Sequence, residues 1–178
     1  MIVVTGATGK LGHLVIDALL KRVPASQIAA AVRTPANAAD LAALGVEVRR
    51  ADYDQPETLA SAFKAGEQVL LISANEVGSR TRQHAAVVDS ATRAGIASIA
   101  YTSVLKADRS TLSLAAEHRA TEEAIRASGL PFVFLRNGWY LENHTDQLGG
   151  ILQRGMLAGS ATTGRFASAA RRDYAEAA

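Results

Sequence analysis

Short apolar runs alternate with longer amphipathic stretches along this chain of 178 residues. The apolar runs predict strands at residues 2–5, 28–32, 46–49, 69–72, 98–102 and 132–135. Between them, apolar residues at helical spacing predict helices at residues 11–19, 38–44, 56–64, 81–94 and 115–127. Strands that alternate with helices indicate parallel βαβ units. We therefore expect an α/β fold, with a doubly wound parallel sheet covered by helices on both faces.

The last part of the chain has a different pattern. Residues 149–172 are rich in Gly, Ala and Ser and predict a loop, and residues 171–178 predict the opening turn of another helix. We expect one domain over residues 1–178, in which roughly the last 30 residues begin a separate region.

Three glycines, Gly6, Gly9 and Gly12, lie between the first predicted strand and the first predicted helix. In dinucleotide-binding folds the first glycine permits a tight turn, the second lets the backbone approach a pyrophosphate, and the third lets the helix pack closely on the strand. The N-terminus of the helix adds unpaired N–H groups and a positive dipole end. Because strand, turn and helix follow in the required order, the sequence favours a Rossmann-type dinucleotide site over a ligand-free turn.

The end of the second predicted strand indicates which dinucleotide is preferred. An NAD-specific site places an acid there to bind the ribose 2′-hydroxyl, whereas this chain has Val32 and Arg33. A guanidinium binds a 2′-phosphate through charge-assisted hydrogen bonds, so Arg33 predicts NADPH. An exposed arginine without a ligand is the alternative interpretation, and Lys10 either adds positive charge nearby or is simply solvated.

Composition excludes several other classes. Lys plus Arg number 19 against 17 for Asp plus Glu, and no dense basic block predicts a nucleic-acid partner. The chain has no cysteine, so it has no thiolate metal ligand or cysteine nucleophile, and the four histidines show no metal-like spacing. No apolar run is long enough to span a membrane. We expect a cytoplasmic protein with no metal, no nucleic-acid partner and no membrane partner, and the sequence leaves its oligomeric state open.

Four segments resemble NmrA-like proteins, which are atypical members of the short-chain dehydrogenase superfamily. They are residues 2–12, 51–53, 99–103 and, most specifically, 135–143. Within that group the sequence closely resembles the bacterial NAD(P)H:quinone oxidoreductases of type 2, with the triphenylmethane dye reductases as near neighbours. The resemblance covers essentially the whole chain.

The resemblance implies three groups of NADPH contacts besides Arg33, which would bind the 2′-phosphate. The pyrophosphate would lie on Gly6, Ala7, Thr8, Gly9, Lys10 and Leu11. The path of the riboses would be lined by Ser73, Ala74 and Asn75. The nicotinamide would be bordered by Asn137, Gly138, Trp139, Tyr140, Leu141 and Glu142. These last two groups follow predicted strands, and open α/β sheets bind ligands beyond the carboxyl ends of their strands.

Two of the implied positions keep a second interpretation. Asp52 is a candidate for the adenine edge, or else it caps the turn that follows it. Trp139 and Tyr140 form either an aromatic wall that stacks a planar quinone or part of the core under their loop.

The catalytic pattern departs from that of carbonyl-reducing short-chain dehydrogenases. Those enzymes use a Tyr and a Lys, spaced Y-x-x-x-K, on the helix after the fifth strand. Here Leu114 occupies the Tyr position and His118 the Lys position, while Tyr101 and Lys106 have the wrong spacing. His118 is a weak candidate for a proton donor, and a packing role is the favoured interpretation.

The resemblance implies an NADPH-dependent reductase that transfers hydride to quinones. Quinone reduction is compatible with the absence of the Tyr and Lys pair, because reduction of an electron-poor quinone needs less proton donation. A reductase of conjugated dyes and a non-enzymatic NADP(H)-sensing NmrA-like regulator remain alternatives. Members of this family continue past the point where the chain stops, so we expect a truncated substrate region, with NADPH binding retained and quinone reduction weakened.

Overall fold

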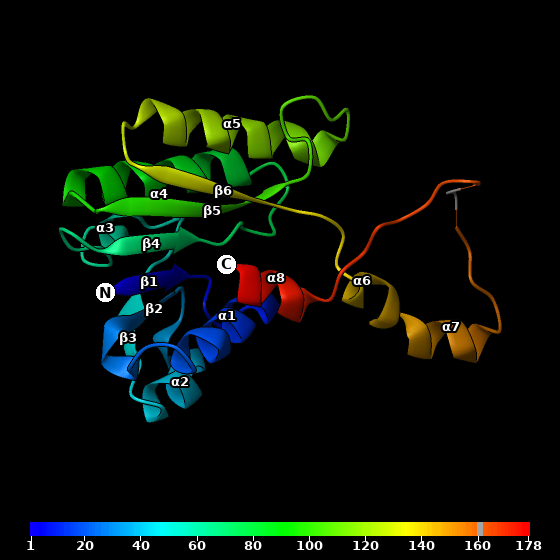
Figure 1. The fold of residues 1–178 in the computed structure, drawn as a ribbon, viewed down its shortest axis with the longest axis horizontal. Helices are drawn as coiled ribbons and strands as arrows, with labels where there is room; N and C mark the ends of the chain where they lie inside the picture. The colour runs from blue at the N-terminus through cyan, green and yellow to red at the C-terminus, as the bar shows by residue number, and fades with distance from the viewer. Residues whose placement is uncertain (160–161) are drawn as a thin grey trace.

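A parallel six-stranded sheet forms the centre of the computed structural model, which describes residues 1–159 and 162–178. The strands are β1 (Ile2–Thr5), β2 (Ile28–Val32), β3 (Glu47–Arg50), β4 (Gln68–Leu71), β5 (Ser98–Val104) and β6 (Phe132–Asn137). They pair in the order β3-β2-β1-β4-β5-β6, as Figure 1 shows. From β1 the chain adds β2 and then β3 toward one edge of the sheet, and from β4 it adds β5 and then β6 toward the other edge. The topological switch point therefore lies between β1 and β4. The predicted doubly wound sheet is confirmed.

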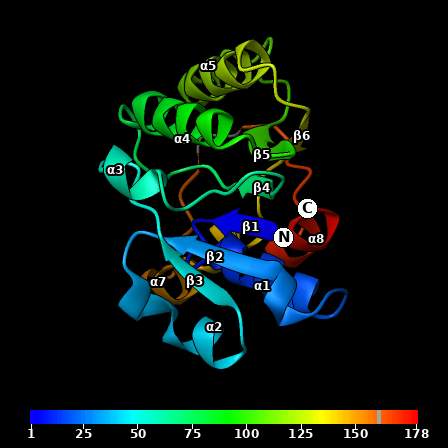
Figure 2. The same ribbon diagram turned by 90° about the vertical axis from the view of Figure 1, so that its left-hand side faces the viewer.

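Helices cover both faces of this sheet (Figure 2). One face carries α1 (Lys10–Leu20), α2 (Ala39–Ala43) and α8 (Arg171–Ala177), together with the short 3₁₀ helices η1 (Ala25–Gln27) and η2 (Pro35–Ala38). The other face carries α3 (Pro56–Leu59), α4 (Arg80–Ala94) and α5 (Ser113–Ala127). The remaining helices, α6 (Glu142–Thr145) and α7 (Leu148–Arg154), lie on an arm that extends away from the sheet (Figure 1). No helix in the described ranges is both long and apolar enough to cross a membrane.

Neighbouring strand residues supply two separate cores. Val3 packs on the side of α4 and Val4 on the side of α1, because successive strand side chains point to opposite faces. All five residues of β2 are buried, which fits a central strand of a sheet that is covered on both sides.

Two predicted elements are corrected by the structure. The helix predicted over residues 56–64 ends at Leu59. Beyond that point the carbonyl of Ala62 accepts a hydrogen bond from Arg49 and the N–H of Lys64 donates to Glu67, so these groups are paired outside a helix. The loop predicted over residues 149–172 is wrong at its beginning, where α7 lies, whereas the helix expected from residue 171 is confirmed as α8.

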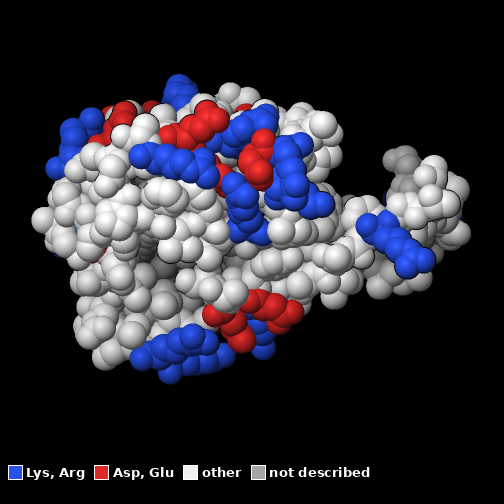
Figure 3. Space-filling model, turned by 45° about the horizontal axis from the view of Figure 1, so that its top comes forward, with Lys and Arg blue, Asp and Glu red and all other residues white. Residues whose placement is uncertain are grey.

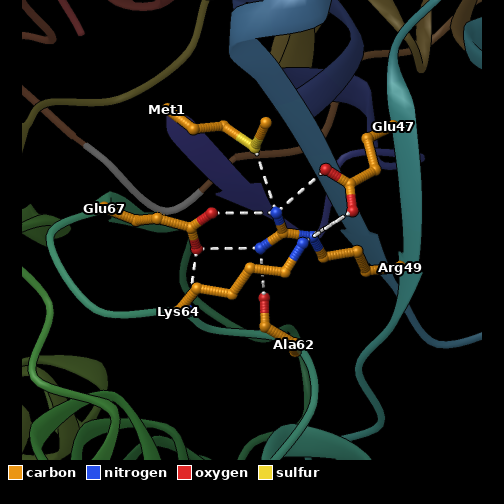
Figure 4. A network of polar contacts seen from close by, with 6 residues as sticks. All are labelled: Met1, Glu47, Arg49, Ala62, Lys64 and Glu67. Atoms are coloured by element: carbon orange, nitrogen blue, oxygen red, sulfur yellow. Dashed lines mark hydrogen bonds and ion pairs between the residues drawn. The ribbon is translucent and has the colours of Figure 1, made fainter.

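A buried ion network holds the amino end of the sheet together (Figure 4). The Arg49 guanidinium on β3 donates to both oxygens of Glu67 at 2.8 Å and to both oxygens of Glu47 at 3.0 Å. Hydrogen bonds from Arg49 lower the pKa of Glu47 to about 2. Glu67 directly precedes β4, so the network joins β3 to the start of β4.

Candidate functional site

Two buried threonines hold the segment that follows β4 against the switch point. The N–H of Ile72 donates to Thr5 Oγ1 at 3.0 Å, and the N–H of Ser73 donates to Thr102 Oγ1 at 2.9 Å. The hydroxyls thereby bind the first two main-chain N–H groups beyond the end of β4. Sequence reasoning did not single out these threonines, although a threonine near the carboxyl end of a buried strand was a usable signal.

The glycine turn leaves main-chain N–H groups at the start of α1 without a partner inside the helix. Gly6 adopts a left-handed conformation (φ +59°), and its carbonyl accepts the N–H of Gly9 at 2.9 Å. The first helical bond runs from the N–H of His13 to the carbonyl of Gly9, so the N–H groups of the three preceding residues have no partner within the helix. Within the described part of the chain, no side chain caps the helix at Gly9. The turn therefore fits an anionic group such as a pyrophosphate.

Gly12 allows α1 to lie directly on this turn. A Cβ atom at Gly12 would stand 2.3 Å from the carbonyl oxygen of Gly6 and 2.7 Å from Cα of Ala7. Both neighbours are backbone atoms, so any larger residue would displace the turn or the helix. The structure therefore shows the close approach of α1 to the preceding backbone that was expected at the third glycine.

The two cations expected near the cofactor phosphates both lie beside carboxylates. Lys10 Nζ is 2.6 Å from Asp146 Oδ2, and the hydrogen bond from Lys10 lowers the pKa of Asp146. Arg33 Nη1 is 3.6 Å from Glu76 Oε1, and both side chains are largely exposed. The sequence did not identify Glu76, because it comes from the segment after β4 whereas Arg33 follows β2.

Ser73, Ala74 and Asn75 follow β4 and are held from the side of α4. The N–H of Ala74 donates to His84 Nε2 at 3.0 Å, and the carbonyl of Ala74 accepts from Arg80 Nε at 2.8 Å. Ser73 and Ala74 are half-buried, and Asn75 is exposed. These bonds place the segment 73–75 at the carboxyl ends of the strands. Its contact with the riboses stays a prediction.

His84 is neutral in this arrangement. Its Nε2 accepts a hydrogen bond, while Nδ1 lies 3.0 Å from Thr121 Oγ1, whose hydroxyl donates to the carbonyl of Glu117. Nδ1 must therefore carry the proton. Burial lowers the pKa of His84 to about 3, and the charge of Arg80 contributes in the same direction.

His118 is a buried residue of α5, and its Nδ1 lies 2.7 Å from the hydroxyl of Tyr101 on β5. Burial lowers the pKa of His118 to about 4, followed by the effect of Arg80, so the ring is uncharged near neutral pH. Burial also raises the pKa of Tyr101. These contacts fit the packing interpretation of His118 better than a role as proton donor.

Trp139 and Tyr140, which follow β6, differ in exposure, and each fits a different one of the two interpretations. Trp139 is 48% exposed, as the wall interpretation requires. Tyr140 is half-buried, its hydroxyl accepts from Asn137 Nδ2 at 3.1 Å, and its ring lies 5.2 Å from that of Tyr174 on α8. Tyr140 therefore packs under the loop, and Trp139 is the one of the two that offers a surface for a planar ligand.

The rest of this segment is joined to the beginning of α8. The N–H of Gly138 donates to the hydroxyl of Tyr174 at 3.1 Å, and both carboxylate oxygens of Glu142 accept the N–H of Arg171 at 2.9 Å. Leu141 is exposed. The structure thus shows a structural partner for Glu142, and a contact of residues 137–142 with a nicotinamide remains a prediction.

Asp52 has the contact expected of a turn cap. Its Oδ1 accepts the N–H of Asp54 at 3.1 Å, which is the side-chain-to-backbone bond of an Asx turn. A contact of Asp52 with the adenine edge stays a prediction.

An apolar cavity of about 240 Å³ lies away from the glycine turn. Its lining includes Ile2, Gln68 and Ser98, which are the first residues of their strands. The cavity therefore lies near the amino ends of the strands and is not part of the candidate site. In the described ranges, no group of three or more His, Cys, Asp or Glu side chains is placed to hold a metal ion.

Comparison with known proteins gives consistent matches. A family model described as NAD(P)H-binding matches residues 6–176. Quinone oxidoreductase 2 of Escherichia coli (strain K12) is 52% identical over 178 residues, which are 100% of this chain and 62% of that protein. The chain therefore spans less than two thirds of the length of this relative.

Two solved structures superpose closely on the chain. One is the NADPH-dependent quinone oxidoreductase of Escherichia coli complexed with NADPH, with a TM-score of 0.94 and 52% identity, over 98% of this chain and 62% of that one. The other is the Citrobacter sp. triphenylmethane reductase complexed with NADP(H), with a TM-score of 0.95 and 44% identity, over 99% of this chain and 63% of that one.

Proposed function

Because the chain belongs to the NAD(P)H-binding family, we propose that it binds NADPH between β1 and α1 and transfers hydride from it to a quinone. The observation that carries the proposal is the glycine turn at the switch point, where three main-chain N–H groups ahead of the first helical bond of α1 have no partner within the helix. The quinone is supported by the 52% identity to quinone oxidoreductase 2 of Escherichia coli.

Different residues of the site bind different parts of the cofactor. The N–H groups of Lys10, Leu11 and Gly12 bind the pyrophosphate, and Arg33 binds the 2′-phosphate. The segment 73–75 orients the riboses, and the segment 137–142 borders the nicotinamide. Bound NADPH supplies the hydride, and the protein supplies position and electrostatics.

Proton donation has a small part in this proposal. Leu114 stands in place of the catalytic tyrosine, and His118 is buried and neutral. A quinone suits such a site, because the anion left after hydride transfer is comparatively stable and can take its proton from water. The exposed ring of Trp139 offers the quinone a stacking surface.

The experiment is an oxidation assay with the purified protein, NADPH and benzoquinone, followed by the absorbance of the cofactor. We expect quinone-dependent oxidation, faster with NADPH than with NADH at equal low concentration. Tight NADPH binding without oxidation would contradict a reductase and favour the NADP(H)-sensing regulator. Reactions without protein give the background rate.

Reduction of a triphenylmethane dye is the second candidate function. It is favoured by the TM-score of 0.95 and 44% identity to the Citrobacter sp. triphenylmethane reductase. The same assay with a triphenylmethane dye in place of benzoquinone separates the two activities, since reduction bleaches the dye. Dye turnover without quinone turnover would replace the first proposal by the second.

A further inference from the structure

An acid lies beside the arginine that is expected to select NADPH. Glu76 Oε1 is 3.6 Å from Arg33 Nη1, and the exposed fractions of the two side chains are 52% and 69%. Dinucleotide sites that prefer NADH place an acid beside the ribose 2′-hydroxyl. In this chain no acid follows β2, but the segment after β4 brings one to the same place.

Buried contacts hold the Glu76 carboxylate in position. Gln83 on α4 is 3% exposed, and its Nε2 donates to Glu76 Oε2 and to Asp54 Oδ2, both at 2.9 Å. Only the NH₂ end of an amide can donate to two carboxylates, so the orientation of Gln83 is determined. Its Oε1 is buried and has no partner in the described part of the chain. The amide keeps this costly orientation because the two carboxylates require it.

We infer that Glu76 is a specificity-determining residue that limits the preference for NADPH over NADH. The inference rests on the proposed function. Glu76 competes with the 2′-phosphate for Arg33 and repels the phosphate charge, and neither effect acts on a 2′-hydroxyl. Arg33 and Glu76 thus act in opposite directions on the same part of the cofactor.

The test compares the dissociation constants of NADPH and NADH for the wild-type protein and Glu76→Gln, measured at low ionic strength. Glutamine retains an oxygen that can accept from Gln83 but removes the charge. We expect the ratio of Kd for NADH to Kd for NADPH to rise about two- to fivefold, which is the effect of one exposed charge pair. The rise should shrink at high salt, because exposed charges are screened.

Asp146→Asn is the matched control. Asp146 pairs with Lys10 at the pyrophosphate turn, which is common to both cofactors, so its removal should leave the ratio unchanged. An unchanged or lower ratio in Glu76→Gln would overturn the inference, and so would an equal rise in Asp146→Asn. If the wild-type protein bound neither cofactor, the proposed function itself would fail, and the inference with it.

Discussion

Charge at the candidate site is divided between exposed ion pairs and buried neutral histidines. Arg33 and Lys10 are exposed and paired with carboxylates, and such pairs contribute little to stability, so a phosphate can displace the carboxylate. His84 and His118 are buried and neutral: His84 binds the N–H of Ala74 after β4, and His118 joins α5 to Tyr101 on β5. The exposed charges are therefore available for the proposed recognition of phosphate, while the buried histidines position the backbone.

The buried histidines predict a loss of stability in mild acid. Their pKa values in the folded protein, about 3 for His84 and about 4 for His118, lie below the ordinary value of 6.5. Below that pH the unfolded chain takes up protons that the folded protein does not. The free energy of unfolding should therefore fall as pH decreases from about 6.5 to about 4.5, by on the order of 1 kcal/mol per pH unit for each histidine.

Urea unfolding at several pH values measures this slope. His118→Asn should reduce the slope even if it lowers stability at neutral pH, because one titrating group is gone. A free energy of unfolding that stays constant from pH 7 to pH 5 would contradict the neutral assignment of both histidines.

The sequence was informative at this scale where a residue lies next to a motif, as Arg33 does at the end of β2. It missed Glu76, Gln83 and Thr102, since each reaches the site only through the pairing of strands or the packing of α4. Spacing along the chain contains no signal for such contacts.

The turn between β1 and α1 is the element on which the cofactor proposal depends. Gly12 is its tightest point, because a Cβ atom there would meet backbone atoms at 2.3 Å and 2.7 Å. A side chain at this position would force α1 to move away from the turn. That movement would also displace the N–H groups expected to bind the pyrophosphate.

We therefore expect Gly12→Ala to lower the free energy of unfolding by about 1–3 kcal/mol, the usual cost of overpacking, and to weaken NADPH binding. Chemical unfolding and cofactor titration measure the two effects. Gly149→Ala is the matched control. It lies within α7, where a Cβ atom would meet nothing within 4 Å, so the same change should be neutral or slightly stabilising. Equal stability of the two variants would contradict the close approach at Gly12.

Strands and long helices followed from the hydrophobic pattern because their periods are clear. The ends of β5 and β6 did not, since Val104 and Asn137 pair beyond the apolar run and only strand pairing shows it. The short α7 was also missed, because Gly149 and Gly150 favour a loop in sequence reasoning, although Leu148, Ile151 and Leu152 have helical spacing.

At the scale of the whole molecule, two half-sheets meet at β1 and β4, and all the candidate cofactor contacts come from segments that follow strands. The Arg49 network joins β3 to Glu67, the residue before β4, and takes no part in these contacts (Figure 4). On the face seen in Figure 3, positive and negative side chains lie side by side, without a broad area of one sign. We therefore expect recognition of the cofactor to depend on local charges, above all on Arg33.

The most direct test of the account is a calorimetric titration of NADPH and NADH into the wild-type protein and Arg33→Ala. The matched control is Arg22→Ala, an exposed arginine just beyond the C-terminal end of α1. We predict that the wild-type protein and the control bind NADPH about tenfold more tightly than NADH, and that Arg33→Ala loses most of this difference, because a charge-assisted hydrogen bond to a phosphate is lost. Equal affinities of the wild-type protein for the two cofactors would contradict the account.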